Sequence, residues 1–213
     1  MNFLKIKLLV IALVVFASSS AFAALSYDVT VNTSAVSGTS GYMYLQYGGL
    51  NGADSTATVT NFSMTGNSAA LGPIDSINVI NNSTVTGTLL GSLGLGFVNT
   101  GGFAVYDYNR AITLGDSIHF TVSFNLATGG TDGGSSTFSL GLFRDATGGS
   151  PLYNITDPSI PGTVALINLF NDGTTTAQSL DSSTEVTPTP IPAAAWLLGS
   201  GLMGLAGIRR RKA

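Results

Sequence analysis

The side chains in this 213-residue sequence with the clearest capacity for chemistry are one histidine and several aspartates. His119 could act as the base of a Ser-His-Asp hydrolase, which needs only one histidine. The sequence contains no Gly-x-Ser-x-Gly motif, and nothing in it pairs His119 with an acidic residue. We therefore interpret His119 as a surface or cross-strand residue. The chain is expected not to be an enzyme, and a hydrolase is the least favoured function.

The aspartates offer a different chemistry, because carboxylate and backbone oxygens bind Ca²⁺. Asp132, Asp145, Asp157 and Asp172 lie in stretches rich in Gly, Ser and Thr, but their spacing matches no EF-hand or calcium repeat. Aspartate is also a common turn residue. We predict no metal and no cofactor, with Ca²⁺ as the open alternative. The glycine-rich run 91–96 lacks the lysine of a phosphate loop and is interpreted as a loop or an irregular edge.

Two pairs of tyrosines could contact sugar rings. Tyr42 and Tyr44 are two residues apart, as are Tyr106 and Tyr108, so each pair shares one face of a strand. If exposed, such rings could stack on a glycan. If buried, they are ordinary sheet aromatics, which is the favoured interpretation.

Alternating apolar and polar residues predict the strands that position these groups. The clearest strand is 116–126, where Ile118, Phe120, Val122 and Phe124 alternate with polar residues. In 56–65 the apolar phase changes near Asn61, which predicts a bulge or a strand end there. Further strands are expected at 25–32, 41–48, 74–80, 84–90, 103–108, 138–142 and 164–170.

This pattern is all-β. Clusters such as Asn51-Gly52, Asp132-Gly133-Gly134 and Asn171-Asp172-Gly173 separate the runs, and nothing between them sustains a helical period. Nine or ten short strands with glycine-rich turns predict an antiparallel β-sandwich, jelly-roll-like in arrangement.

The N-terminus predicts export. Met1 to Ala23 has two lysines, a ten-residue apolar core and the cleavage sequence Ala21-Phe22-Ala23, so a signal peptide at 1–23 should be removed before Ala24. The exported part then keeps only Arg110 and Arg144 as cations against 11 acidic residues, a formal charge of −9. That balance argues against nucleic acid as a partner. The chain has no cysteine, which excludes disulfides, thiolate metal sites and a cysteine nucleophile.

The C-terminus predicts a membrane helix. Residues 193–208 carry no charge, and with the two preceding residues they would form a helix of roughly 27 Å, close to the thickness of a bilayer core. The basic tail 209–213 follows, with Arg209, Arg210, Arg211 and Lys212. Cations at this end favour the cytoplasmic side of a membrane. A plain membrane anchor has the same pattern.

The order of a proline motif (Pro190, Ile191, Pro192, Ala193), an apolar helix and an arginine cluster resembles the PEP-CTERM sorting signal. That signal occurs in surface proteins of Gram-negative bacteria that make extracellular polysaccharide. The resemblance implies recognition and cleavage near the proline motif by an exosortase, a membrane-embedded enzyme resembling cysteine transpeptidases. Ile191 stands where the namesake motif has glutamate, and apolar residues occur at this position in the Pro-x-Pro-Ala-Ala variant of the signal.

The middle of the chain is similar to an uncharacterised family of proteins with PEP-CTERM tails. The similarity lies in residues 26–34, 37–42 and 168–174, and it implies no activity. We predict an ectodomain at 24–180, an extended Ser/Thr/Pro linker at 181–190 and a sorting signal at 191–213.

The resulting expectation is an exported, exosortase-processed protein of the cell surface or extracellular matrix. It would use signal peptidase and the general secretion machinery, pass transiently through the inner membrane, and reach the outer surface or matrix. Its expected role is structural or adhesive in biofilm or floc, associated with exopolysaccharide. A carbohydrate-binding module is the alternative.

Overall fold

The computed structural model describes residues 25–189, apart from 80–83, 99–102, 127–132, 154 and 156. Leu25–Thr189 forms one compact unit. The predicted signal peptide, sorting motif, membrane helix and basic tail lie outside the described residues. Within the described part of the chain, no helix is long and apolar enough to cross a membrane.

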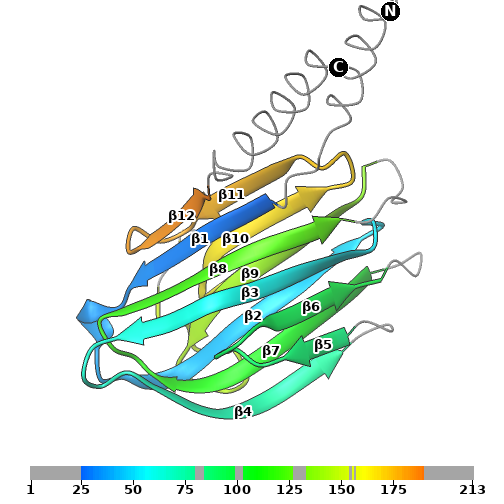
Figure 1. Ribbon diagram of the computed structural model, residues 1–213. Helices are drawn as coiled ribbons and strands as arrows, with labels where there is room; N and C mark the ends of the chain where they lie inside the picture. Colours follow the sequence, from blue (N-terminus) through cyan, green and yellow to red (C-terminus); the bar gives the residue numbers. More distant parts are fainter. Residues whose placement is uncertain are drawn as a thin grey trace, which may run out of the picture. The chain divides into compact units, whose positions relative to one another are not determined.

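The described unit consists of two antiparallel sheets that pack face to face (Figure 1). The first sheet, sheet A, has the strand order β12-β1-β8-β3-β6-β5, and the second, sheet B, has the order β11-β10-β9-β2-β7-β4. The expected all-β sandwich is therefore confirmed. The strands are β1 (Leu25–Asn32), β2 (Ser40–Leu50), β3 (Ser55–Thr65), β4 (Ala70–Val79), β5 (Thr84–Gly87), β6 (Leu93–Phe97), β7 (Phe103–Thr113), β8 (Ser117–Leu126), β9 (Ser135–Phe143), β10 (Thr163–Phe170), β11 (Thr175–Ser179) and β12 (Thr184–Pro188).

The core lies between the sheets and follows the period-two pattern of the sequence. In β8, Ile118, Phe120, Val122 and Phe124 are buried, as the alternation predicts. The phase change in β3 is a bulge, as expected: Asn61 has φ of 55°, and the register with β8 shifts between Thr60 and Ser63. The shift allows residues on both sides of Asn61 to face the core.

Two segments that the sequence presented as irregular are strands. The glycine-rich run 91–96 contributes β6, which pairs with both β3 and β5, so the prediction of a loop or irregular edge was wrong. Gly94 and Gly96 lie opposite Thr86 and Thr84, where an added Cβ would come within 2.6 and 2.8 Å of the threonine hydroxyls. Glycine at these two positions lets β6 lie close to the threonines of β5, and it does not mark a turn here.

The predicted linker at 181–190 was also wrong. It contains β12, which pairs with β1 and forms an edge of sheet A, while β11 lies at the edge of sheet B. Thr184 is buried, but Glu185 and Thr187 face outward, so β12 has the polar composition of an exposed edge strand. Pro188 is tolerated because it ends an edge strand. The compact unit therefore extends to Thr189 rather than Leu180.

Two buried tyrosines opposite each other in sheet B provide a test of the core. The Tyr47 hydroxyl hydrogen-bonds with the hydroxyls of Ser55 (2.7 Å) and Ser136 (2.8 Å), whereas the buried Tyr106 hydroxyl has no partner among the described residues. We expect Tyr47→Phe to lower the free energy of unfolding by about 1–3 kcal/mol, because two buried serines lose their partner. Tyr106→Phe should be neutral or stabilising by about 1 kcal/mol. Urea denaturation measures both, and equal losses would contradict the assigned hydrogen bonds.

Candidate functional site

His119 lies on the outer face of sheet A, between Thr30 of β1 and Ser63 of β3. It is half-buried, and within the described ranges its imidazole makes no hydrogen bond and no ion pair. No acid orients it and no nucleophile contacts it, so the described residues give His119 no triad geometry. This position agrees with the interpretation as a cross-strand residue.

The aspartates of the predicted acidic turns use their carboxylates locally. In four turns, a Ser or Thr two positions after the aspartate donates both its backbone N–H and its hydroxyl to one carboxylate oxygen, at Asp145, Asp157, Asp172 and Asp181. The hydroxyl bonds are the main reason that the pKa values of Asp145, Asp157 and Asp172 are lowered. The N–H distances are 2.9 Å at Thr147, 2.9 Å at Ser159, 2.8 Å at Thr174 and 2.8 Å at Ser183, which bonds Asp181.

These turns are not assembled into a metal site. Across the part of the chain that the structure describes, no three His, Asp or Glu side chains lie close enough together to hold a metal ion. Asp132 lies outside the described residues. The carboxylates of Asp145, Asp157, Asp172 and Asp181 fix the turns in which they occur.

The four tyrosines proposed as glycan contacts divide between the two faces of sheet B. Tyr106 and Tyr108 are 0% and 1% exposed, because the even-numbered residues of this part of β7 face the core. Their burial fits the favoured interpretation of ordinary sheet aromatics and leaves these two rings unavailable to a glycan. Tyr42 and Tyr44 point outward from β2 and are partly exposed.

Tyr44 has a structural contact that limits its availability. Its hydroxyl donates to the backbone oxygen of Ala146, and its ring packs edge-on against Phe143 at 4.9 Å between centroids. Asn109, fully buried on β7, donates to the same oxygen at 3.0 Å. Burial is the main reason that the pKa of Tyr44 is raised, with a further contribution from Asp145. Tyr44 and Asn109 thus hold the β9–β10 loop against the sheet.

Tyr42 lines a shallow hollow of about 370 Å³ beside this loop. Arg144, the first residue after β9, lines it too, with the hydroxyl residues Ser40 and Thr113. Ala111, opposite Tyr42 on β7, adds only a methyl group. We call this feature the Tyr42–Arg144 hollow. An aromatic ring, a guanidinium and hydroxyls around an open surface can bind a polar ligand with a flat apolar face.

A row of hydrogen-bonded polar side chains continues across the same outer face. Gln46 donates to Asp107 at 2.6 Å and accepts from Ser139 at 3.3 Å. Thr137 donates to Asn168 at 2.7 Å, and Asn168 donates to Thr176 at 3.1 Å. Partial burial raises the pKa of Asp107, an effect that the bond from Gln46 opposes. This face therefore offers hydrogen-bonding groups well beyond the hollow.

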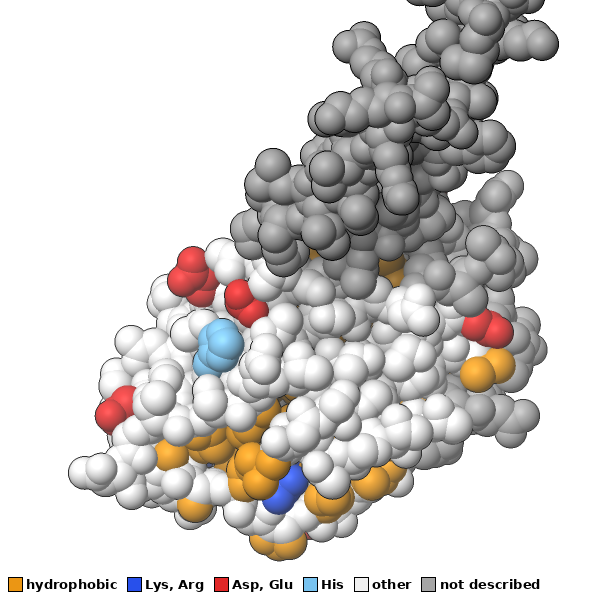
Figure 2. Space-filling view, viewed as in Figure 1, with side chains coloured by type: hydrophobic (Ala, Val, Ile, Leu, Met, Phe, Trp, Pro, Cys, Tyr) orange, Lys and Arg blue, Asp and Glu red, His pale blue; other side chains and the backbone are white. Residues whose placement is uncertain are grey.

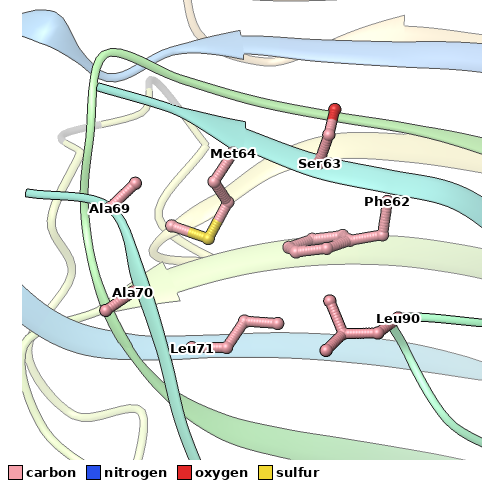
Figure 3. Close-up of a pocket in the computed structure, with 7 residues that line it drawn as sticks. All are labelled: Phe62, Ser63, Met64, Ala69, Ala70, Leu71 and Leu90. Carbon is pink, nitrogen blue, oxygen red and sulfur yellow. The ribbon is translucent and has the colours of Figure 1, made fainter. Parts of the chain in front are cut away.

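A second hollow shares Ala70 and Leu71 with the Tyr42–Arg144 hollow and is otherwise lined mainly by apolar side chains. Phe62 and Met64 of β3, Leu71 of β4 and Leu90 converge on it, while Ser63 points away (Figure 3). Figure 2 shows hydrophobic side chains gathered in this region, beside a sheet A face that carries few charges. These apolar side chains are left uncovered because the strands of the two sheets differ in length. In sheet A, β5 and β6 have 4 and 5 residues, whereas in sheet B β7 and β4 have 11 and 10.

The sequence indicated Tyr42 but not its companion residues. Arg144 follows a strand by one position and belongs to no motif, so only the folded loop reveals that it faces Tyr42. Asn109 had no signal in the sequence beyond being polar within an apolar strand. No family model, no curated protein and no solved structure matches the chain, so the assignment of this site depends on its own geometry.

Proposed function

We propose that the chain is an exported surface or extracellular-matrix protein that is processed at both ends and displays a jelly-roll-like β-sandwich. A signal peptide would direct export through the general secretion machinery. An exosortase would then recognise the Pro190–Ala193 motif while the apolar helix and the cations of residues 209–212 hold the tail in the inner membrane. The released domain would contribute to cohesion of a biofilm or floc.

The main support is the agreement between the ends of the fold and the predicted processing sites. The compact unit begins at Leu25, one residue after the expected mature N-terminus, and ends at Thr189, one residue before the proline motif. The end strands pair with each other: β1 and β12 are antiparallel neighbours, and the Thr189 N–H donates to the Ser26 oxygen at 2.8 Å. Removal of both terminal segments would leave this pairing complete.

Association with exopolysaccharide is the second part of the proposal. The Tyr42–Arg144 hollow and the polar row beside it lie on one sheet face, which suits a polymer that makes many weak contacts. A carbohydrate-binding function is therefore favoured over a passive structural role. The described residues offer no constellation that favours a hydrolase.

The test is the mass of the protein at the surface of a Gram-negative host that encodes an exosortase. We expect mass spectrometry of surface or matrix material to find an N-terminus at Ala24 and no peptide from residues 193–213. Replacing Arg209, Arg210, Arg211 and Lys212 with glutamine should leave the protein unprocessed, because the cations set the depth of a short helix.

A host that lacks the exosortase gene is the control, and it should retain the full C-terminus. If residues 193–213 remain attached to surface material in the exosortase-positive host, the tail is a plain anchor and the sorting proposal fails. If Met1–Ala23 is retained on the exported protein, the proposed removal of a signal peptide before Ala24 fails as well.

A further inference from the structure

The Tyr42–Arg144 hollow combines an aromatic ring with an exposed cation on an otherwise acidic domain. We propose that it binds a sugar unit that carries a carboxylate, such as a uronic acid within an anionic polysaccharide. This inference rests on the proposed function, because it names the class of glycan that the surface protein would contact. It adds a residue, Arg144, and a chemical selectivity that Tyr42 alone would not provide.

Arg144 is available for a ligand, in contrast to the other arginine of the domain. Arg110 donates through Nε to the Gly72 oxygen at 2.9 Å and through a terminal nitrogen to the Tyr108 hydroxyl at 3.1 Å. The Arg144 side chain is exposed, and within the described ranges it has neither a hydrogen bond nor an ion pair. A guanidinium with free donors binds carboxylates through two parallel N–H bonds.

The neighbouring carboxylate does not neutralise Arg144. Asp145 accepts bonds from Thr147 and, at 3.1 Å, from the Gly149 N–H, so it serves its own turn. These hydrogen bonds lower the pKa of Asp145, which therefore stays ionised. The negative charge of Asp145 lies beside the hollow and opposes long-range attraction of an anion. An anionic ligand must therefore be held by direct hydrogen bonds from Arg144.

The backbone that carries Arg144 is fixed before any ligand arrives. The Arg144 N–H donates to the Ser150 oxygen at 2.7 Å, and Phe143 forms a β-bridge with Pro151. Tyr44 and Asn109 hold the intervening loop at the Ala146 oxygen. A positioned backbone reduces the entropy lost on binding, which matters for weak sugar ligands.

Glycines at the base of the hollow let its strands pack closely together. Gly72 lies against Ala111, where an added Cβ would come within 2.9 Å of the alanine methyl. At Gly41 a Cβ would come within 2.5 Å of the Phe143 oxygen, so glycine allows β2 to pack against the base of the loop. With Tyr42 on one side and the hydroxyls of Ser40 and Thr113 nearby, a sugar ring could present its apolar face to Tyr42 and its hydroxyls to the sheet.

The experiment uses the full-length chain in mild detergent and a panel of oligouronides, each paired with its methyl ester. The ester keeps the ring, the linkage and the length but removes the charge. We expect calorimetry to show that at least one acid form binds about tenfold or more tightly than its ester. Arg144→Gln should abolish that difference, Arg144→Lys should restore part of it, and Tyr42→Ala should weaken both forms.

His119→Gln, on the outer face of the other sheet, is the matched control and should change nothing. Equal binding of acids and esters overturns the inference but leaves the surface-protein proposal intact, since that proposal depends on processing. Binding of no acid form below about 1 mM also overturns it. Poly-glutamate that competes as well as a uronide would assign the hollow to an acidic protein instead.

Discussion

Replacing Phe120 with alanine is expected to lower the free energy of unfolding of the Ala24–Thr189 domain by about 3–5 kcal/mol. Phe120 is fully buried at the centre of β8. Its ring lies 6.1 Å from that of Phe138 in sheet B and 6.5 Å from that of Phe62 across the β3 bulge, between centroids. Alanine would leave a cavity between the two sheets that the closed core cannot fill. Urea denaturation monitored by circular dichroism measures the loss.

The matched control is Phe170→Ala at the end of β10, where the ring is 36% exposed. It removes the same atoms from a site that water already reaches, so we expect a loss of less than about 1 kcal/mol. If Phe120→Ala also costs less than 1 kcal/mol, the strand phase assigned to β8 is incorrect. A spectrum dominated by helix would contradict the fold itself.

The parts of the fold that the sequence predicted are those with strong alternation. In β1 and β8 the apolar residues occur at every second position, and the structure buries Val29, Val31, Ile118 and Phe120 accordingly. The bulge at Asn61 was also visible, because a bulge shifts the phase of the pattern. These features are local and need no knowledge of which strands pair.

The parts that could not be predicted depend on neighbours that are distant in sequence. Gly94 and Gly96 form a strand because β3 and β5 lie on either side of them. The segment 184–188 forms a strand because β1 offers a free edge. A tyrosine in a strand also does not reveal its face: Tyr42 and Tyr106 each have a second tyrosine two positions later, but one is partly exposed and the other is fully buried.

Arg144 could not be predicted for a related reason. Its role depends on how the β9–β10 loop folds back, which two distant residues determine: Tyr44 on β2 and Asn109 on β7. Neither hydrogen bond belongs to a sequence motif. The sequence therefore indicated Tyr42, the aromatic residue of the candidate site. It did not indicate Arg144, the cation to which we attribute the charge preference.

The second large effect is expected from truncation of β12. A domain that ends at Leu180 should be less stable by about 2–4 kcal/mol than one that ends at Thr189, and it should associate at high concentration. The truncated domain loses buried Thr184, partly buried Val186 and the ladder between β12 and β1. Each lost hydrogen bond contributes about 0.5–1.5 kcal/mol, and a partly buried valine about 1 kcal/mol. Unpaired β1 would also present a new strand edge to other molecules.

Comparing the domains that end at Leu180 and at Thr189 tests whether residues 181–189 act as a strand or as a linker, because these nine residues are the only difference. Urea denaturation and size-exclusion chromatography of both domains provide the measurement. Equal midpoints and equal elution would show that residues 181–189 act as the linker that their composition suggested. A clear loss would mean that the domain needs its chain up to Thr189, next to the proline motif. Proteolytic processing at Pro190–Ala193 could then release the tail without opening the sandwich, whereas cleavage ten residues earlier would remove an edge of sheet A.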